Sequence, residues 1–346
     1  MMPQTSRILH IDSLRGVAVL LMVMVHSAAT WNPFDSDQET ILAYIVSGLG
    51  GLAAPLFVTL FGWGMLRSKL NLKNRIFQAT FLLFCQVLVN IVSPHLFNPF
   101  TPGILSLMAI LTIIFPLIDH CLKKLNLNFI LISTTIIMLV QILFPEIQGT
   151  GDWGDRVSDT SILIVASNLF LTGTYPLFPW IIFSIFGATI SSFQNNESQS
   201  LPIDKKTIST TILGLLFCII TFILSQYNGE LWAHPSSKAY LTFFPVNYGF
   251  LIAAITGILM IWLFVQRFEL NFLASTGRLS LTIYVLHFIP LSLMYNFDTQ
   301  YEWSIGISAS IVMLYTLIWM PISLLLLRFI PNINLEKLLR VARKSL

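Results

Sequence analysis

Ten long apolar segments follow one another along the chain, separated by polar stretches. A helix that crosses the hydrocarbon core of a bilayer needs about 20 apolar residues, and each segment approaches that length. The pattern predicts an all-α fold, a polytopic membrane helical bundle with about ten transmembrane helices. The predicted helices are 14–31, 45–66, 76–93, 103–118, 128–144, 174–193, 207–225, 246–265, 279–295 and 305–328.

Composition supports this prediction and excludes several other classes. Hydrophobic residues make up 55% of the 346 positions and charged residues only 10%, which excludes a disordered chain and leaves little polar surface for a large soluble domain. The net charge of +3 is too small to indicate a nucleic-acid partner. The three cysteines show no CxxC or Cys/His spacing, so we expect no metal site. We expect one membrane domain over 1–346.

The distribution of charge predicts the orientation, because Lys and Arg concentrate in cytoplasmic loops. With the N-terminus inside, every Lys and Arg except Arg156 and Lys238 falls on the inner side. Acidic residues on the outer side include Asp35, Asp37, Glu39, Asp152, Asp155, Asp298 and Glu302. We therefore expect both termini to be cytoplasmic, in an integral multi-pass membrane protein.

The connection 145–173 is the longest predicted outer segment. Its part 161–171 is apolar but too short to span a bilayer, and we expect an interfacial or re-entrant helix there. A polar inner linker, 194–206, divides the first six predicted helices from the last four.

Two histidines, His26 and His287, lie inside apolar segments, where an ionisable side chain is a functional hypothesis because its burial must be compensated. Arg15 precedes His26 by eleven residues, which places both on one helix face with a rise of about 16 Å between them. That face would carry a cation at the inner boundary and a base at depth. Alternatively, Arg15 only orients the helix and His26 makes one interhelical hydrogen bond. Asp12 is predicted to cap the helix with Ser13 and to pair with Arg15.

These residues and several later motifs resemble a known family. The run from Arg7 through Arg15-Gly16 to His26 is similar to the opening of the transmembrane acyltransferase superfamily, and the Arg, ten residues, His spacing matches the acyltransferase-3 signature. Other motifs resemble the branch that contains heparan-α-glucosaminide N-acetyltransferase. They are Leu56-Phe57-Val58 to Gly62, Gly103-Ile104-Leu105, Tyr175-Pro176-Leu177-Phe178-Pro179-Trp180 to Gly187, and Gly277-Arg278-Leu279-Ser280 through Tyr284 to His287.

The resemblance implies an acyltransferase that moves an acyl group, here an acetyl group, from cytoplasmic acyl-CoA to an extracytoplasmic glycan or glycolipid, as in cell-envelope glycan modification. The acceptor would be a hydroxyl or an amine. His26 would be the general base or a transient acyl carrier, and Arg15 would have a catalytic or donor-binding role.

Further candidates follow from position. His287 shares a helix face with Ser280 and Tyr284, which could line a cavity and stabilise charge on a carbonyl oxygen, or could form only a structural polar cluster. On a continuous helix Arg278 would face away from His287. Arg278, Arg67 and Arg75 are candidate ligands of the CoA phosphates, although the orientation rule also explains each.

On the outer side, Tyr175 and Trp180 flank prolines that interrupt a helix, and we expect them to bind the acceptor unless they only anchor the helix at the interface. His95 and His234 lie in loops and are expected to be solvated.

Two alternatives remain open at the level of sequence. A transporter or flippase of a small solute or lipid-linked saccharide would also use buried histidines and proline-broken helices. A scaffold without catalysis is the other. We expect the lipid bilayer, acyl-CoA and the acceptor as partners, no nucleic acid, and leave a homo-oligomer open.

Overall fold

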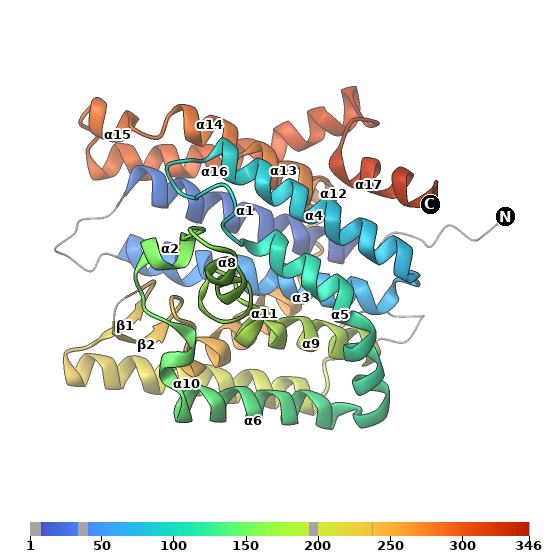
Figure 1. The fold of residues 1–346 in the computed structure, drawn as a ribbon. Coiled ribbons are helices and arrows are strands. Elements are labelled where there is room, and N and C mark those ends of the chain that lie inside the picture. Colours follow the sequence, from blue (N-terminus) through green and yellow to red (C-terminus); the bar gives the residue numbers. More distant parts are fainter. Residues whose placement is uncertain (1–7, 34–40, 194–199, 237, 346) are drawn as a thin grey trace.

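The computed structural model describes residues 8–33, 41–193, 200–236 and 238–345. Arg7, the acidic residues Asp35, Asp37 and Glu39, and residues 194–199 of the predicted linker lie outside the described residues. The fold is a bundle of long helices, most of them running along a common direction (Figure 1).

The first half of the bundle consists of six helices. They are α1 (Leu9–Trp31), α2 (Ile41–Gly50), α3 (Ala53–Arg67), α4 (Leu72–Val92), α5 (Ile104–Leu125) and α6 (Leu127–Leu143). The connection that follows contains four short helical pieces. These are the 3-10 turn η1 (Pro145–Gln148), α7 (Trp153–Val157), α8 (Ile162–Ser167) and the π-helical η2 (Asn168–Thr172).

The second half carries the remaining long helices and several short pieces. They are α9 (Leu177–Phe193), α10 (Lys205–Asn228), α11 (Tyr248–Phe268), η3 (Asn271–Leu273), α12 (Ala274–Arg278), α13 (Ser280–Leu286), α14 (Phe288–Leu293), α15 (Phe297–Gln300), α16 (Ile305–Phe329) and α17 (Leu335–Lys344). Between α10 and α11, the strands β1 (Leu231–His234) and β2 (Ala239–Thr242) form a two-stranded parallel sheet. Neither this sheet nor α17 was predicted from the sequence.

Each of the ten predicted segments coincides with helix over most of its length. Within the described residues, eight helical segments are long and apolar enough to cross a membrane. A ninth is the pair 162–172 and 177–193, which is bent by 46°, and Leu127–Leu143 is an apolar helix of 17 residues. The short helix predicted over 161–171 is therefore present, as one arm of the bent pair. The protein is an all-α, integral, multi-pass membrane protein.

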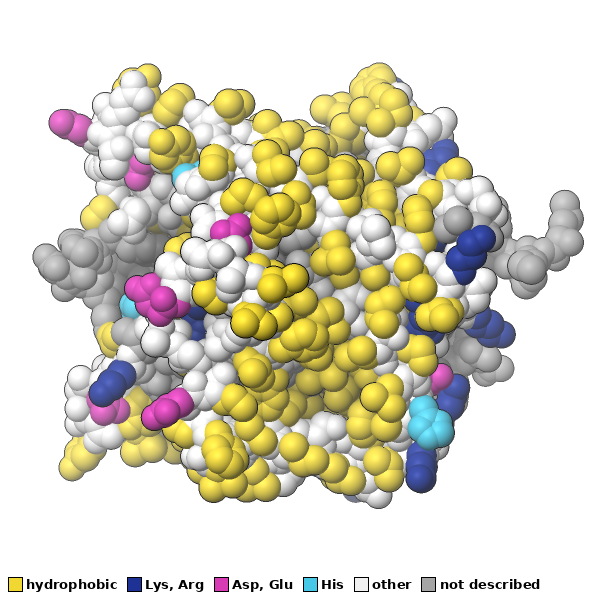
Figure 2. All heavy atoms as spheres, viewed as in Figure 1, with side chains coloured by type: hydrophobic (Ala, Val, Ile, Leu, Met, Phe, Trp, Pro, Cys, Tyr) yellow, Lys and Arg dark blue, Asp and Glu magenta, His cyan; other side chains and the backbone are white. Residues whose placement is uncertain are grey.

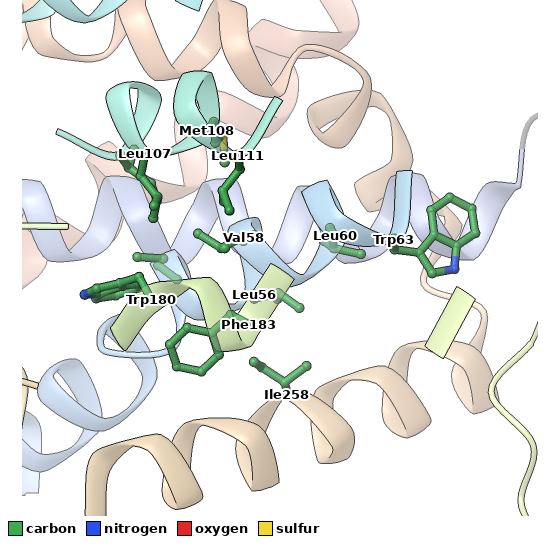
Figure 3. Close-up of a cluster of buried hydrophobic side chains, with 14 of the residues drawn as sticks. Leu56, Val58, Leu60, Trp63, Leu107, Met108, Leu111, Trp180, Phe183 and Ile258 are labelled. Atoms are coloured by element: carbon green, nitrogen blue, oxygen red, sulfur yellow. The ribbon is translucent and has the colours of Figure 1, made fainter. Parts of the chain in front are cut away.

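The centre of the bundle is α3, whose side chains pack against α5, α9 and α11 (Figure 3). Leu56 and Val58 of α3 are completely buried there, as is Phe183 of α9. Close approach depends on two motif glycines. A Cβ at Gly62 would lie 2.1 Å from the Ser184 carbonyl oxygen, and one at Gly187 would lie 1.8 Å from the Thr59 carbonyl oxygen. The two glycines therefore allow the backbones of α3 and α9 to touch, as small residues do in membrane bundles.

The face of the molecule shown in Figure 2 is apolar across its middle and carries most of its charged side chains toward its two ends. Lys and Arg gather at the end that holds the start of α1, the last turns of α3 and α5, and α17; we call this the basic end. Asp and Glu gather mostly at the opposite, acidic end, which holds α7 and α15. Exposed Leu, Ile and Phe between the two ends are suited to contact lipid, because a bilayer replaces water as their solvent.

One local prediction at the start of a helix needs correction. The helix α1 begins at Leu9, so Asp12 lies inside its first turn and the Ser13 hydroxyl donates to the Leu9 carbonyl instead of capping the helix. The predicted ion pair is present, with Arg15 Nη1 at 2.9 Å from Asp12 Oδ1. The predicted helix 279–295 corresponds to the membrane-crossing segment Ser280–Gln300, within which α13 ends and α14 begins at His287.

Candidate active site

The structure brings together the two histidines that the sequence singled out. His26, on the part of α1 that approaches the acidic end, lies against His287 at the junction of α13 and α14. His26 Nδ1 and His287 Nε2 are 2.9 Å apart, and the rings are nearly parallel at 10° with centroids 5.1 Å apart. His287 is completely buried, and the buried ring of Phe288 covers both imidazoles. The two side chains form a histidine dyad.

The hydrogen bonds of the dyad assign its tautomers. His287 Nδ1 lies 3.0 Å from the Ile283 carbonyl oxygen, which can only accept, so Nδ1 carries the proton. In a neutral ring His287 Nε2 is then an acceptor, and His26 Nδ1 must donate to it. The proton of His26 is thus on Nδ1, and its lone pair is on Nε2. Within the described residues Nε2 of His26 has no hydrogen-bond partner, so this nitrogen is available as a base.

A second helix fixes the backbone at the dyad. The Tyr315 hydroxyl of α16 donates to the carbonyl oxygen of His287, at the point where α13 gives way to α14. Pro290, one turn later, has no N–H to offer, which favours a helix break near this position. His287 is therefore held through its ring by Ile283 and through its backbone by Tyr315.

Two cavities approach the dyad from opposite ends of the bundle. The basic-end cavity, of about 350 Å³, is lined by Arg15, Ser280 and Tyr284 among others. The acidic-end cavity, of about 760 Å³, is lined by His26, Tyr175 and Tyr284 among others. Phe57, Ile104 and Tyr284 belong to both linings, so one thin wall separates the cavities.

Arg15 stands in the wall of the basic-end cavity, one third exposed and paired with Asp12. Its helix packs closely on α12, because a Cβ at Gly277 would lie 1.7 Å from the Asp12 carbonyl oxygen. Arg15 and His26 therefore line different cavities along the same helix, with a rise of about 16 Å between them.

The other predicted donor-binding arginines lie outside the lining of this cavity. Arg67 donates from Nε to the Ser191 hydroxyl, 3.0 Å away, and its guanidinium covers the Trp63 ring. Arg75 donates to the carbonyl oxygens of Leu70 and Thr112. Arg278 is exposed at the end of α12.

Of the two predicted acceptor-binding aromatic residues, one lines a cavity and the other does not. Tyr175 lines the acidic-end cavity, and its ring meets Trp180 edge-on with centroids 5.0 Å apart. Trp180 itself is completely buried behind Tyr175, and its Nε1 has no hydrogen-bond partner among the described residues. Trp180 is therefore a core residue here, with no face for a sugar to stack on.

Sequence reasoning missed the contribution of α17 to the basic-end cavity, where Glu336, Arg340 and Arg343 line the wall. The available signal was the amphipathic run 335–344, in which polar and apolar residues alternate with a helical period. In the acidic-end cavity, Asp152, Trp153 and His234 were missed as lining residues, because Asp152 caps and Trp153 begins the short helix α7 and His234 ends the strand β1, and no periodicity in the sequence indicates either element.

One outer histidine corrects an earlier expectation, and one outer arginine has a structural role. His95 was expected to be solvated, but its ring nitrogens are buried and its ring stacks on Tyr295, and this burial lowers the pKa of His95 below 6.5. Arg156 is buried and donates to the carbonyl oxygens of Gln148, Thr150, Thr172 and Gly173. Burial lowers the pKa of Arg156 to about 10. Arg156 thereby holds the outer connection together.

The fold and the dyad define a multi-pass membrane protein with a buried histidine pair beside one of two opposed cavities, an arrangement suited to chemistry or transport across the bilayer. A model of the acyltransferase-3 family, described as an acyltransferase domain, matches residues 8–328. The chain belongs to the acyltransferase-3 family and is an acyltransferase. No curated protein sequence matches it. The matched region includes the whole dyad and ends before α17.

Proposed function

We propose that the protein transfers an acyl group, in the first place an acetyl group, from cytoplasmic acyl-CoA to a hydroxyl or amine of an extracytoplasmic glycan or glycolipid. The observation that carries the proposal is the histidine dyad, since His26 lines the cavity opposite to the one that holds Arg15. The basic end is taken as cytoplasmic because Lys and Arg gather there. The donor then enters the basic-end cavity and the acceptor enters the acidic-end cavity.

His26 is the general base in this proposal. Its Nε2 takes the proton of the acceptor hydroxyl or amine as the acceptor atom attacks the thioester carbonyl carbon. A new C–O or C–N bond forms and the C–S bond breaks. The leaving thiolate of CoA receives the proton from His26, so the products are the acylated acceptor and free CoA. The Nδ1–H of His26 keeps its hydrogen bond to His287 throughout, which orients the ring as the partner of a catalytic histidine does.

Tyr284 is the proposed donor to the carbonyl oxygen. It belongs to the wall shared by both cavities, and within the described residues its hydroxyl makes no hydrogen bond. A phenol placed there would stabilise the negative charge that builds on the oxygen during attack. Ser280, at the start of α13 and in the basic-end cavity, lies on the side of the donor.

The lining of the acidic-end cavity suits a sugar. Phe97, Trp153 and Phe244 offer aromatic faces for the apolar faces of a pyranose ring, and Asp152 and His234 offer hydrogen-bonding groups for its hydroxyls. Tyr175 completes the aromatic wall close to the core. We assign the acceptor to this cavity for that reason.

The experiment is transfer of radiolabelled acetyl from acetyl-CoA by the purified full-length protein in lipid nanodiscs. The acceptor is a glycan extract from cells that lack the protein. Removal of a general base lowers the rate by about 10² to 10⁴-fold, and His26→Ala should show a loss of that size. Gly306→Ala, which places a methyl group in open space, should keep wild-type activity. Full transfer by His26→Ala would refute the assignment of the base.

Rapid-quench labelling distinguishes the direct route from a route through acylated His26. The direct route predicts that no acetyl-protein accumulates during turnover. If an acetyl-protein forms and decays at the rate of turnover, Nε2 of His26 acts as a nucleophile and not as a general base. Uptake of a sugar into proteoliposomes without any acyl donor would instead favour transport.

A further inference from the structure

The helix α17 is a wall of the basic-end cavity although it follows the region matched by the acyltransferase family. Three of its polar side chains, Glu336, Arg340 and Arg343, line the cavity. At 100° per residue they fall within an arc of about 60° on one helix face. Leu338 and Val341 lie on the other side of the helix and are more than half exposed. The cationic face of α17 is thus turned toward the cavity.

Glu336 fixes the start of α17 to the helix that carries Tyr284. One of its carboxylate oxygens accepts from the backbone N–H groups of Leu281 and Thr282, at 2.6 and 3.1 Å, and the other accepts from the Thr282 hydroxyl. No side chain of α13 itself caps these N–H groups, so Glu336 supplies the cap from another helix. In return, the Thr282 hydroxyl accepts from the backbone N–H of Leu335 at 2.9 Å.

Arg343 fixes the other end of α17. Its Nη1 donates to Gln78 Oε1 of α4 at 2.7 Å. α17 therefore spans the cavity mouth from α13 to α4, and its two polar contacts determine which face it presents.

The two guanidinium groups on this face outnumber its one carboxylate, that of Glu336. Arg15 is paired with Asp12, and Glu336 uses both oxygens in the cap of α13. Arg340 and Arg343 make no ion pair with any described residue. The pKa of Arg343 is lowered, first by burial and then by the positive charge of Arg340, so the two guanidinium groups repel each other. An anion between them would relieve that repulsion.

We propose that α17 is a donor-binding element, in which Arg340 and Arg343 bind the phosphate groups of the CoA nucleotide. This inference rests on the proposed function, because it takes acyl-CoA as the donor. Guanidinium groups bind phosphate through paired, charge-assisted hydrogen bonds, and the cavity they line leads to the wall at Tyr284. Glu336 is a positioning residue that sets the face of α17 and does not touch the donor.

The test compares two acetyl donors with the full-length protein in nanodiscs. Acetyl-CoA carries the nucleotide phosphates, whereas S-acetylpantetheine carries none. Arg340→Ala should raise the KM for acetyl-CoA about tenfold or more, with kcat at saturating donor nearly unchanged. The KM for S-acetylpantetheine should stay the same. Lys344→Ala is the matched control, since Lys344 lies on the same helix, is exposed and does not line the cavity.

Arg343→Ala should raise the KM for acetyl-CoA in the same way, but it also removes the hydrogen bond to Gln78, so Arg340→Ala is the decisive variant. If the wild type uses acetyl-CoA and Arg340→Ala behaves like Lys344→Ala, the inference about α17 fails alone. If the wild type neither binds CoA nor uses acetyl-CoA, the proposed function fails and the inference fails with it. An equal rise of KM for both donors would mean that Arg340→Ala disturbs the fold, and it would overturn the proposal that Arg340 binds phosphate.

Discussion

The substitution His287→Phe isolates the contribution of the dyad. Phenylalanine keeps a flat ring of similar size but has no nitrogen, so the hydrogen bond from His26 Nδ1 is lost while the packing against Phe288 is retained. With no acceptor at Nδ1, the proton of His26 is free to move to Nε2. The ring would then present an N–H group to the acceptor, where the proposed mechanism needs a lone pair.

The size of the loss follows from one buried hydrogen bond. A buried donor that loses its partner costs about 1 to 3 kcal/mol, which corresponds to about a 5- to 150-fold lower kcat if the cost falls on the reactive tautomer. His26→Ala removes the base itself and should cost at least as much. His287→Gln can place an amide oxygen near Nδ1 of His26 and should recover part of the activity.

The measurement is kcat for acetyl transfer in nanodiscs, together with the thermal midpoint of each variant. Tyr315→Phe is the comparator for structural loss, because it removes the hydrogen bond to the His287 backbone and leaves the ring contacts intact. We expect its midpoint to fall while kcat changes less than in His287→Phe. The reasoning is refuted if His287→Phe folds normally and turns over like the wild type.

Three further predictions concern the scaffold. Arg156→Ala should lower stability by about 2 to 4 kcal/mol, since four carbonyl oxygens lose their donor, and Arg156→Lys should recover only part; chemical unfolding in detergent measures both. Gly187→Ala should lower the thermal midpoint by pushing α9 off Thr59, an overpacking cost of about 1 to 3 kcal/mol or more, whereas Gly306→Ala should not. Burial holds the pKa of His95 below 6.5, so as pH falls the unfolded chain binds a proton before the folded chain does. The free energy of unfolding should therefore decline below about pH 6.5. His95→Phe should reduce this decline, as measured by thermal unfolding at about pH 5 and pH 7.

The bundle was predictable because its solvent is lipid. A helix in a bilayer must satisfy its own backbone hydrogen bonds and be apolar over its whole length, so each long segment stands out in the sequence. The segregation of Lys and Arg from Asp and Glu at opposite ends of the bundle also agrees with the pattern in the sequence (Figure 2). Loops obey no such constraint, and the parallel pair β1 and β2 went unpredicted for that reason.

The dyad was predictable only as two separate residues. Each histidine stands out alone in an apolar run, but the distance between them depends on how α1 meets the junction of α13 and α14, and no local pattern encodes that contact. The expectation for Arg278 and His287 assumed one continuous helix. The helix is interrupted at Leu279, directly after Arg278, so the angle between Arg278 and His287 cannot be counted at 100° per residue.

The prediction of donor-binding arginines from the sequence was limited for a different reason. Arg67, Arg75 and Arg278 were proposed because they lie near helix ends, but many arginines at the basic end satisfy that description. Arg340 differs from these arginines because it lies on α17, whose orientation is set by Glu336. Glu336 contacts Leu281, which lies 55 residues earlier in the sequence. Long-range polar contacts of this kind leave no periodic signal in the sequence.

The position of the wall between the cavities explains why the site has only a few polar groups. The proposed donor is a thioester, which water can also attack, so the proposed mechanism requires the wall where donor and acceptor would meet to exclude bulk solvent. Phe57 and Ile104 supply apolar surface there, and Tyr284 supplies one hydroxyl. Where water is excluded, hydrogen bonds are stronger and an unpaired polar atom is costly. Nδ1 of His287 is paired with the Ile283 carbonyl oxygen for this reason. Within the described residues Nε2 of His26 has no protein partner, so in the proposed mechanism it is the atom that the acceptor contacts.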